Sequence, residues 1–299
     1  MLKSFNEIEN QVRNAKQRTI AVAMAEDKDL LMAIEKARLK GLMKALLVGE
    51  KSKIKSIFKI TNIDERNYDL IDSKGEENSV SEAVSLVREG AAQVLMKGLC
   101  STSVFLKAIL NKESGLQSGK VLSHLSVFES PNYHKVLMMS DAAINIAPDL
   151  SEKISILENA ISAAHKLGYH NPKVAIISAI EKVNPIGMPS TADAAIIAKM
   201  ADRGQIKGGV IDGPLAIDNA LSSQSCKVKG LKTTVGGEAD ICIVPNIETG
   251  NVFYKLLTIL GNAKVAGIIV GAQAPVVLSS RSDSEESKYL SIITALKAT

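Results

Sequence analysis

The sequence of 299 residues predicts an α/β protein built on a mainly parallel sheet. Short apolar runs alternate along the chain with segments in which apolar residues recur at helical spacing. Hydrophobic residues make up 46% of the chain but aromatic residues only 3%, and there is no Trp, so aliphatic residues must build the core. Such a core suits helices packed on a sheet, and the length is enough for about two domains.

The first third of the chain shows the strand–helix–strand rhythm most clearly. Residues 19–25 and 44–49 are apolar runs typical of buried strands, and residues 29–40 between them have the helical pattern. Another apolar run follows at 92–98. Strands that alternate with helices in this way form right-handed βαβ units, so we expect a mainly parallel sheet.

Two helix starts carry capping-box patterns. Ser79 with Glu82, and Asp149 with Glu152, have the spacing at which the first side chain caps the helix and the second reaches back. We expect the first of these helices to end at Gly90, since glycine is the usual residue after a helix end.

The remaining strand candidates fall into two groups. The runs 121–128 and 134–141 are joined by a short turn, which allows an antiparallel pair. Four more candidates are separated by segments long enough for helices, and they lie at 172–178, 208–214, 239–245 and 265–271.

Charge and special residues argue against several classes of protein. The net charge is only +4 and the lysines are scattered, so we expect no nucleic-acid partner. The three cysteines form no C-x-x-C pair and the histidines lack metal-binding spacing, so we expect reduced thiols and no metal site. The polar N-terminus lacks a signal-peptide core and no apolar run is long enough to span a bilayer, so we expect a cytoplasmic protein without membrane contact.

Residues just after each strand are the first candidates for a site, because ligands of open α/β sheets bind beyond the carboxyl ends of the strands. Lys97 supplies positive charge there, and Gly98 allows close approach of the backbone. Ser101, Thr102 and Ser103 follow at the start of an apolar helix, where free N–H groups and hydroxyls form an anion site. A plain helix cap explains the same serines equally well, so both interpretations stay open.

Polar residues after two later strands are weaker candidates for a ligand-binding cleft. Asp212 begins a turn that ends in Pro214, and a proline at the first position of a helix needs no functional explanation. Asn251 and Lys255 lie near the start of the next helix, where capping and exposure to solvent explain them adequately.

Near the C-terminus, the apolar run in "APVVLSSRSDSEESKYL" gives way to serines, an arginine and acids. Asp283 and Glu286 have capping-box spacing for a final helix. Arg281 lies beside that helix N-terminus, where the macrodipole disfavours a cation. An anion next to Arg281 and Ser280 would resolve this conflict, and an arginine that points to water is the alternative.

Seven segments in the same order resemble the phosphate acetyl/butyryltransferase family, with a likeness that runs from about residue 15 to the end. They are "VLMKGLCSTSVFLKAIL", "VLSHLSVFESP", "MSDAAINIAPDL", "PKVAIISAIEKVNP", "RGQIKGGVIDGPLAIDNAL", "ADICIVPNIETGNVFYKLL" and "GAQAPVVLSSRSDSEESK". Each segment alone is weak evidence, but the ordered combination is highly specific.

The resemblance implies reversible transfer of a short-chain acyl group from a CoA thioester to inorganic phosphate, which gives acyl phosphate and CoA. It implies two three-layer αβα domains with an active-site cleft between them, an isocitrate/isopropylmalate dehydrogenase-like arrangement. We expect 1–117 with 266–299 to form the first domain and 118–265 the second. The family further implies a homodimer or larger homo-oligomer, a place in fatty acid metabolism, and no cofactor, since CoA is a substrate.

Site roles also follow from the resemblance. We place Asp212, Asn251 and Lys255 in the cleft that binds substrate or CoA. Ser280 and Arg281 match the family's Ser-Arg motif, in which the arginine binds phosphate or acyl phosphate. The hydroxyls of 101–103 match its phosphate loop, to which we add Lys97. Lys107 stands where acetyl-transferring relatives carry an arginine, so it is a further candidate for binding phosphate.

The base that accepts the CoA thiol proton is less obvious. Acetyl-transferring relatives place an aspartate seven residues after the motif serine, where this chain has Ser287. Glu286 is our candidate, although Glu286 and Asp283 also fit helix caps. A thiol with a pKa of about 8.5 is partly ionised near pH 8, so a strong base is not required. A covalent route through Ser280 or Cys100 has no base paired with either residue.

Three other functions remain as alternatives. The chain could prefer acetyl or branched-chain acyl groups, since pocket residues set chain length. A dehydrogenase of the same architecture would need metal-binding aspartates and arginines spaced on a helix, and the sequence has no such cluster. A non-catalytic CoA-binding protein would not need the Ser-Arg motif and the phosphate loop.

Overall fold

The computed structural model describes residues 2–278 and 283–299, and the chain divides into two compact units. The first unit consists of Phe5–Lys120 and Ala266–Thr299, and the second of Met1–Ser4 and Val121–Val265. The chain passes from the first unit to the second after Lys120 and returns after Val265, whereas we expected the domain boundaries at residues 117 and 266. The residues up to Ser4, which we expected in the first domain, belong to the second unit, because the Leu2 carbonyl accepts the Val136 N–H at 3.0 Å.

The first unit is built on a sheet in the order β3-β2-β1-β4-β11-β10. Its strands are β1 Arg18–Ala23, β2 Met43–Gly49, β3 Asp69–Asp72, β4 Val94–Lys97, β10 Lys264–Val270 and β11 Val276–Val277. All neighbours are parallel except β10 and β11. The buried strands β1 and β4 match the predicted apolar runs.

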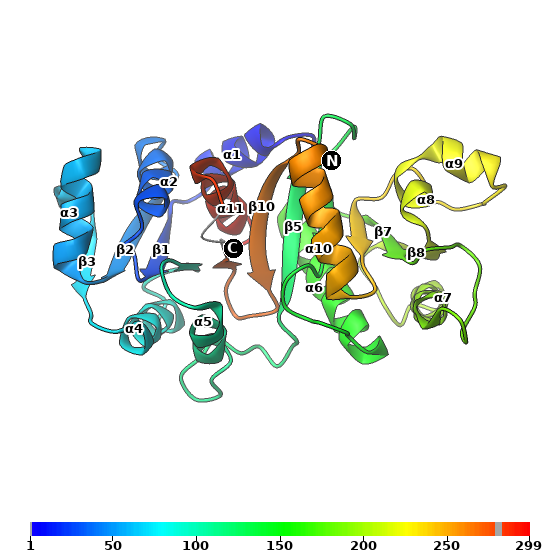
Figure 1. The fold of residues 1–299 in the computed structure, drawn as a ribbon, viewed down its shortest axis with the longest axis horizontal. Coiled ribbons are helices and arrows are strands. Elements are labelled where there is room, and N and C mark those ends of the chain that lie inside the picture. Colours follow the sequence, from blue (N-terminus) through cyan, green and yellow to red (C-terminus); the bar gives the residue numbers. More distant parts are fainter. Residues whose placement is uncertain (1, 279–282) are drawn as a thin grey trace. The chain divides into compact units, whose positions relative to one another are not determined.

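Helices cover both faces of this sheet (Figure 1). They are α1 Phe5–Arg13, α2 Lys28–Leu39, α3 Lys51–Thr61, α4 Glu76–Arg88, α5 Thr102–Ile109 and α11 Glu285–Lys297, with a short 3-10 turn at Glu65–Asn67. Helices α4 and α5 pack on each other at one face, and α11 packs on α1 and α2 at the other. At that second face Tyr289 donates to the Glu9 carboxylate at 2.6 Å, and Lys288 lies 3.8 Å from the Asp27 carboxylate.

The second unit has a sheet in the order β5-β6-β9-β7-β8. Its strands are β5 Ser123–Glu129, β6 Leu137–Ser140, β7 Lys173–Ile177, β8 Val210–Leu215 and β9 Ile241–Ile243. Strands β5 and β6 form the antiparallel pair, and the other neighbours are parallel. The prediction of an α/β fold with a mainly parallel sheet is confirmed.

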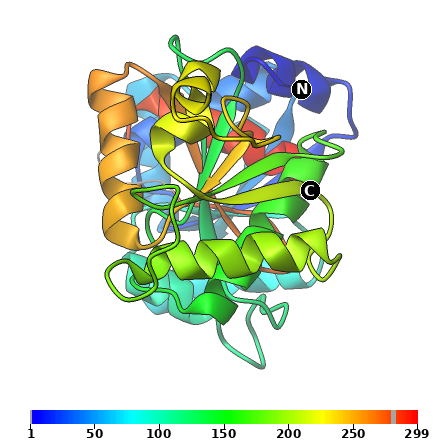
Figure 2. The same cartoon turned by 90° about the vertical axis from the view of Figure 1, so that its right-hand side faces the viewer.

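Helices also flank this second sheet (Figure 2), with α7 below the strands and α8 and α9 above them in that view. They are α6 Leu150–Lys166, α7 Pro189–Asp202, α8 Ile217–Leu221, α9 Ser223–Val228 and α10 Ile247–Lys255, which continues as a π-helix over Leu256–Leu260. Helix α10 covers the sheet with two of the few aromatic side chains, because Phe253 and Tyr254 pack on the buried Phe128.

The predicted helix starts are right in one case and wrong in two. The Asp149–Glu152 capping box is present at the start of α6. Helix α4 instead begins at Glu76, after a glycine with φ +82°, so Ser79 is a buried residue inside the helix. Helix α11 is capped by Ser284, whose hydroxyl accepts the Ser287 N–H at 3.1 Å, and no Asp283–Glu286 box forms.

Pro214 is also placed differently from the prediction. It lies within β8 rather than at the first position of a helix, and α8 starts later, after the cap residue Ala216. The strand tolerates a proline because β8 is an edge strand of the second unit, which pairs only with β7 there.

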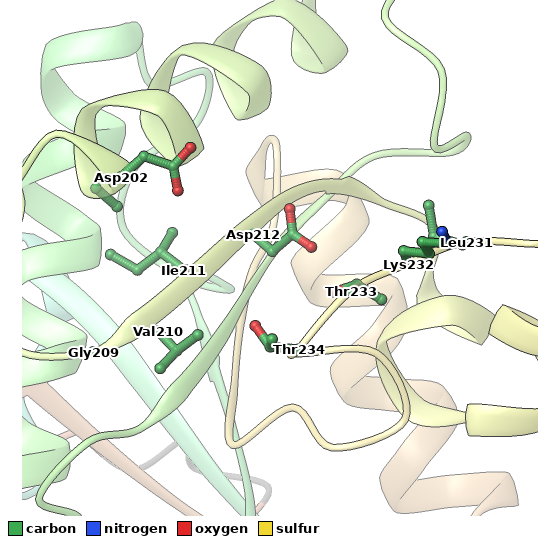
Figure 3. A pocket seen from close by; sticks show the side chains of 10 residues that line it. Asp202, Gly209, Val210, Ile211, Asp212, Leu231, Lys232, Thr233 and Thr234 are labelled. Carbon is green, nitrogen blue, oxygen red and sulfur yellow. The ribbon is translucent and has the colours of Figure 1, made fainter.

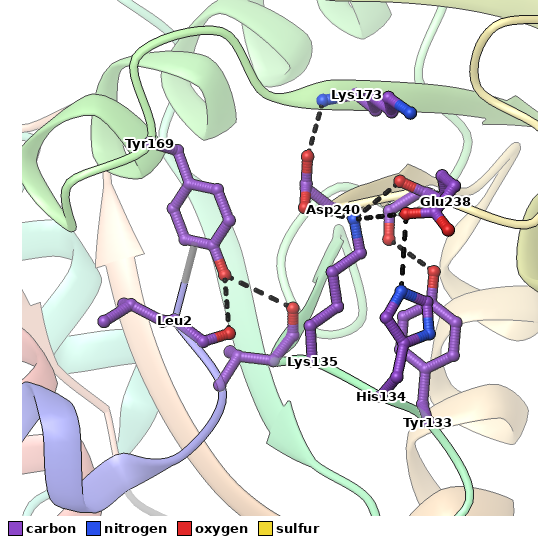
Figure 4. Close-up of polar contacts among 10 residues, drawn as sticks. Leu2, Tyr133, His134, Lys135, Tyr169, Lys173, Glu238 and Asp240 are labelled. Atoms are coloured by element: carbon purple, nitrogen blue, oxygen red, sulfur yellow. Dashed lines mark hydrogen bonds and ion pairs between the residues drawn. The ribbon is translucent and has the colours of Figure 1, made fainter.

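A buried ion pair connects the amino ends of three strands in the second unit (Figure 4). The Lys135 ammonium, whose side chain is fully buried, lies 2.6 Å from one Asp240 carboxylate oxygen and donates to the Glu238 carbonyl at 2.7 Å. The other Asp240 oxygen accepts the Lys173 N–H at 2.8 Å. These contacts hold the starts of β6, β9 and β7 together.

Asp240→Asn should lower the free energy of unfolding by about 3 kcal/mol, because it removes the nearest counter-charge of the buried Lys135 ammonium. The partly exposed Glu238 carboxylate, 3.7 Å from that ammonium, then remains as its charged partner. Asp202→Asn is the matched control, since Asp202 pairs with Lys199 at 3.1 Å on the surface and such pairs contribute about 0–1 kcal/mol. Urea unfolding followed by circular dichroism measures both. Equal losses in the two variants would contradict the structural role of the buried pair.

Candidate functional site

The loop that follows β4 is pressed against the end of β1. Gly98 donates its N–H to the Ala23 carbonyl, and Leu99 donates to the Met24 carbonyl, each at 2.8 Å. A Cβ atom on Gly98 would overlap the Met24 carbonyl oxygen, so only glycine fits. The close approach at Gly98 is made to the end of β1, and it directs the chain into α5. A close approach of Gly98 to a ligand stays a prediction.

Lys97 places a positive charge at the base of the same loop. It is the last residue of β4 and is 3% exposed. Its ammonium donates to the Gly98 carbonyl at 3.3 Å. A buried cation at the carboxyl end of a central parallel strand is suited to attract an anion.

The hydroxyl residues of the loop form the start of α5. Ser101 is the N-cap, and its hydroxyl accepts the Val104 N–H at 3.3 Å. The Ser103 hydroxyl lies 3.3 Å from the Ser101 hydroxyl, while Thr102 and Ser103 are exposed. The capping interpretation is therefore confirmed, and it leaves the side chains of Thr102 and Ser103 accessible to a ligand.

A carboxylate that sequence reasoning missed also reaches this loop. Glu76, the first residue of α4, accepts the backbone N–H of Ser101. The contact joins the starts of two neighbouring helices across 25 positions in the sequence. Only an acidic first turn of α4 hinted at it, and that pattern is common at helix starts.

Lys107 lies one turn after Ser103 on α5, on the same face of the helix. Its side chain is exposed and lines a hollow of about 170 Å³ between α4 and α5, together with Glu77, Asn111 and Ser114. Its role as a phosphate ligand stays a prediction.

Cys100 is adjacent to the hydroxyls but is not suited to act as a nucleophile. The side chain is buried, and burial raises the pKa of its thiol to about 11. Only the thiolate is a good nucleophile, so almost none of the reactive form exists at pH 7–8.

Asp212 lies on β8 rather than after it, since the strand extends to Leu215. Its carboxylate accepts the Gly213 N–H at 2.8 Å. Asp212, Lys232, Thr233 and Thr234 line a groove of about 790 Å³ in the second unit (Figure 3). The groove follows the edge strand, and Asp212 points into it.

Asn251 and Lys255 both lie exposed on α10, one turn apart. The helix is capped by Asn246, whose side chain accepts the Thr249 N–H at 2.9 Å, so capping does not explain Asn251. The Asn251 amide instead reaches the Ala142 carbonyl at 3.5 Å. The assignment of Asn251 and Lys255 to a cleft that binds substrate or CoA stays a prediction.

The predicted Ser-Arg motif, Ser280 and Arg281, lies outside the described residues. Glu286 is the second residue of α11, and Asp283 precedes the cap residue of that helix. Ser287 is the third residue, and its hydroxyl accepts from the Ser284 hydroxyl at 3.2 Å.

Two negative findings concern residues 2–278 and 283–299 alone. Their His, Cys, Asp and Glu side chains form no group that could hold a metal ion. No helix in this part of the chain is both long enough and apolar enough to cross a membrane.

Comparison with known proteins identifies the family. The family model described as Phosphate acetyl/butaryl transferase matches residues 76–296. The chain belongs to this family. It is 47% identical over 295 residues to the phosphate butyryltransferase of Clostridium acetobutylicum, which covers 99% of this chain and 98% of the relative. It is 40% identical to the phosphate acetyltransferase of Thermotoga maritima, with 94% and 95% covered.

A solved structure of the same family supports the fold. The crystal structure of a branched-chain phosphotransacylase from Enterococcus faecalis matches with a TM-score of 0.84 and 36% identity. The match covers 94% of this chain and 99% of the other. This family member therefore has the same α/β fold over nearly its full length.

Gly98→Ala should destabilise the protein by about 2 kcal/mol or more, because a Cβ atom forces the loop away from the end of β1. Gly90→Ala is the control: Gly90 has φ +82° and open space around it, so only backbone strain of about 1 kcal/mol is expected. Urea unfolding compares the two. A smaller loss for Gly98→Ala than for Gly90→Ala would contradict the close approach.

Proposed function

We propose that the chain is a phosphate butyryltransferase, which catalyses the reversible reaction of butyryl-CoA with inorganic phosphate to give butyryl phosphate and CoA. The observation that carries this proposal is the 47% identity, over nearly the full length of both chains, to a phosphate butyryltransferase. The loop at the start of α5 supports it, because a buried lysine, exposed hydroxyls and a helix N-terminus meet there.

The reaction is a direct displacement at a carbonyl carbon. A phosphate oxygen attacks the thioester carbonyl, and the resulting tetrahedral intermediate carries an oxyanion. Collapse of this intermediate breaks the C–S bond and releases CoA as a thiolate, which takes up a proton. Donors that surround the oxyanion lower the barrier, and we assign this role to Arg281 and the amides at the start of α5. Binding two anionic substrates next to each other in one site lowers the barrier further.

In the reverse direction a group must accept the CoA thiol proton. Ser287 is no substitute for an aspartate, because a serine hydroxyl is not a base at neutral pH. We retain Glu286, the adjacent residue of α11, as the candidate acceptor. A covalent acyl-cysteine intermediate is disfavoured, since the pKa of the Cys100 thiol is raised to about 11 by burial.

Further properties extend this proposal by the resemblance alone. We expect a homodimer or larger homo-oligomer, a cytoplasmic enzyme of fatty acid metabolism, and no cofactor besides the substrate CoA. The alternative substrate is a branched acyl group, which the solved phosphotransacylase with 36% identity favours.

Release of CoA from acetyl-, butyryl- and branched C5-acyl-CoA, with and without phosphate, tests the activity and the chain length. We expect phosphate-dependent release with the highest kcat/KM for butyryl-CoA, about 100-fold or more above acetyl-CoA, because butyryl has two more methylenes and each is worth about ten-fold or more in an apolar pocket. A preference for a branched substrate would replace butyrate as the substrate but keep the reaction. No phosphate-dependent release from any of the three would contradict the proposed function.

Arg281→Ala should lower kcat by about 100- to 1,000-fold, the usual effect of removing one donor to an oxyanion. The thermal unfolding midpoint should stay close to that of the unmodified protein, which separates loss of chemistry from loss of fold. Steady-state rates at saturating phosphate measure the effect. Near-normal turnover in this variant would remove Arg281 from the mechanism.

A further inference from the structure

The Ser101 amide already has an anionic partner in this structure. Glu76 begins α4, and its half-buried carboxylate accepts the N–H of Ser101, the cap residue of α5. The Ser101 hydroxyl is occupied by the Val104 N–H and lies beside the Ser103 hydroxyl. A carboxylate of the protein therefore occupies a donor of the loop that the proposed function assigns to phosphate.

The charges around the loop agree with this arrangement. Glu76 and Lys97 both act on the thiol of Cys100, where Lys97 lowers its pKa and Glu76 raises it, while burial has the largest effect. The Lys97 ammonium donates to the Gly98 carbonyl and the Glu76 carboxylate accepts the Ser101 N–H, so the loop contacts groups of opposite charge. An incoming phosphate is attracted by Lys97 and repelled by Glu76.

Stabilisation of α4 does not by itself explain why Glu76 reaches Ser101. An acidic residue in the first turn is favourable for any helix, and Glu77 meets that need equally well. Glu77 faces the hollow beside Lys107, whereas Glu76 contacts the neighbouring helix. The contact with Ser101 is therefore specific to one of two adjacent acids.

We propose that Glu76 is an internal competitor of phosphate: it holds the Ser101 amide in the ligand-free enzyme and must give it up when phosphate binds. This inference rests on the proposed function, because it takes the 101–103 loop as the phosphate site. Glu76 is a positioning residue, which acts on phosphate through the Ser101 amide. It sets the phosphate affinity, and through it the phosphate concentration at which the forward reaction saturates.

The variant Glu76→Gln removes the negative charge of the Glu76 side chain but keeps its shape. The glutamine carbonyl can still accept the Ser101 N–H, so the loop keeps its geometry, but the negative charge is gone. Two like charges about 4 Å apart weaken binding by about five-fold even with the screening of bulk water, and more in a half-buried site. The KM for phosphate should therefore fall about five- to ten-fold, while kcat and the KM for butyryl-CoA change less than about two-fold.

Glu82→Gln is the matched control, because it removes the same charge from an exposed position of the same helix. Its KM for phosphate should stay within about two-fold of the unmodified enzyme, since exposed charges are screened. The proposal is overturned if Glu76→Gln leaves the KM for phosphate equal to that of Glu82→Gln, or raises it. A fall in kcat at unchanged KM would also overturn it, because Glu76 would then act in the chemical step.

Two further measurements keep the test decisive. Glu76→Asp retains the charge but shortens the reach, so its KM for phosphate should lie between those of the unmodified enzyme and Glu76→Gln. It replaces Glu76→Gln if that variant does not fold. The rise in unfolding temperature caused by inorganic phosphate alone measures binding without turnover, and it should be larger for Glu76→Gln than for the unmodified protein.

The phosphate-binding measurement also separates the two proposals. If the unmodified protein releases no CoA, but phosphate stabilises Glu76→Gln more than the unmodified protein, the proposed function fails and the competition stands. If CoA release is phosphate-dependent but all variants bind phosphate alike, the proposed function stands and the competition fails.

Discussion

The contact between the loop after β4 and the end of β1 determines the geometry of everything at the proposed phosphate site. Two parallel neighbouring strands end side by side, and the chain leaves β4 so close to the Met24 carbonyl that Gly98 has no room for a side chain. The two hydrogen bonds at 2.8 Å fix the direction in which the loop departs. The start of α5, its cap Ser101 and the contact with Glu76 all follow from that direction.

Buried charged side chains lie at the amino ends of the strands in the second unit and at a carboxyl end in the first. In the second unit a buried lysine, an aspartate and a main-chain amide join the amino ends of β6, β9 and β7. In the first unit the carboxyl ends carry Lys97 and the hydroxyls of 101–103. In the first unit these are the ends at which ligands of open α/β sheets bind.

The sequence predicted what is local and missed what is distant. Apolar runs located most strands. They did not predict β3, because its residues are half-buried or exposed on an edge strand. Ser101 was recognised as a cap from its neighbours alone. The sequence did not reveal Glu76 as the partner of the Ser101 amide, since no spacing rule links residues on different helices. The start of α4 was misplaced for a different, local reason: Gly75 rather than a polar cap precedes it.

The first unit is formed by two separate parts of the chain, and this has a consequence for folding during synthesis. The chain leaves the first unit near Lys120, completes the second, and returns at Ala266 with β11 and α11. Helix α11 packs on α1 and α2, so these early helices keep an uncovered apolar face until α11 has left the ribosome. The second unit, although encoded later than most of the first, is the one that can finish first. A chain that ends before α11 would therefore expose apolar surface on α1 and α2, which are synthesised first, rather than on the second unit.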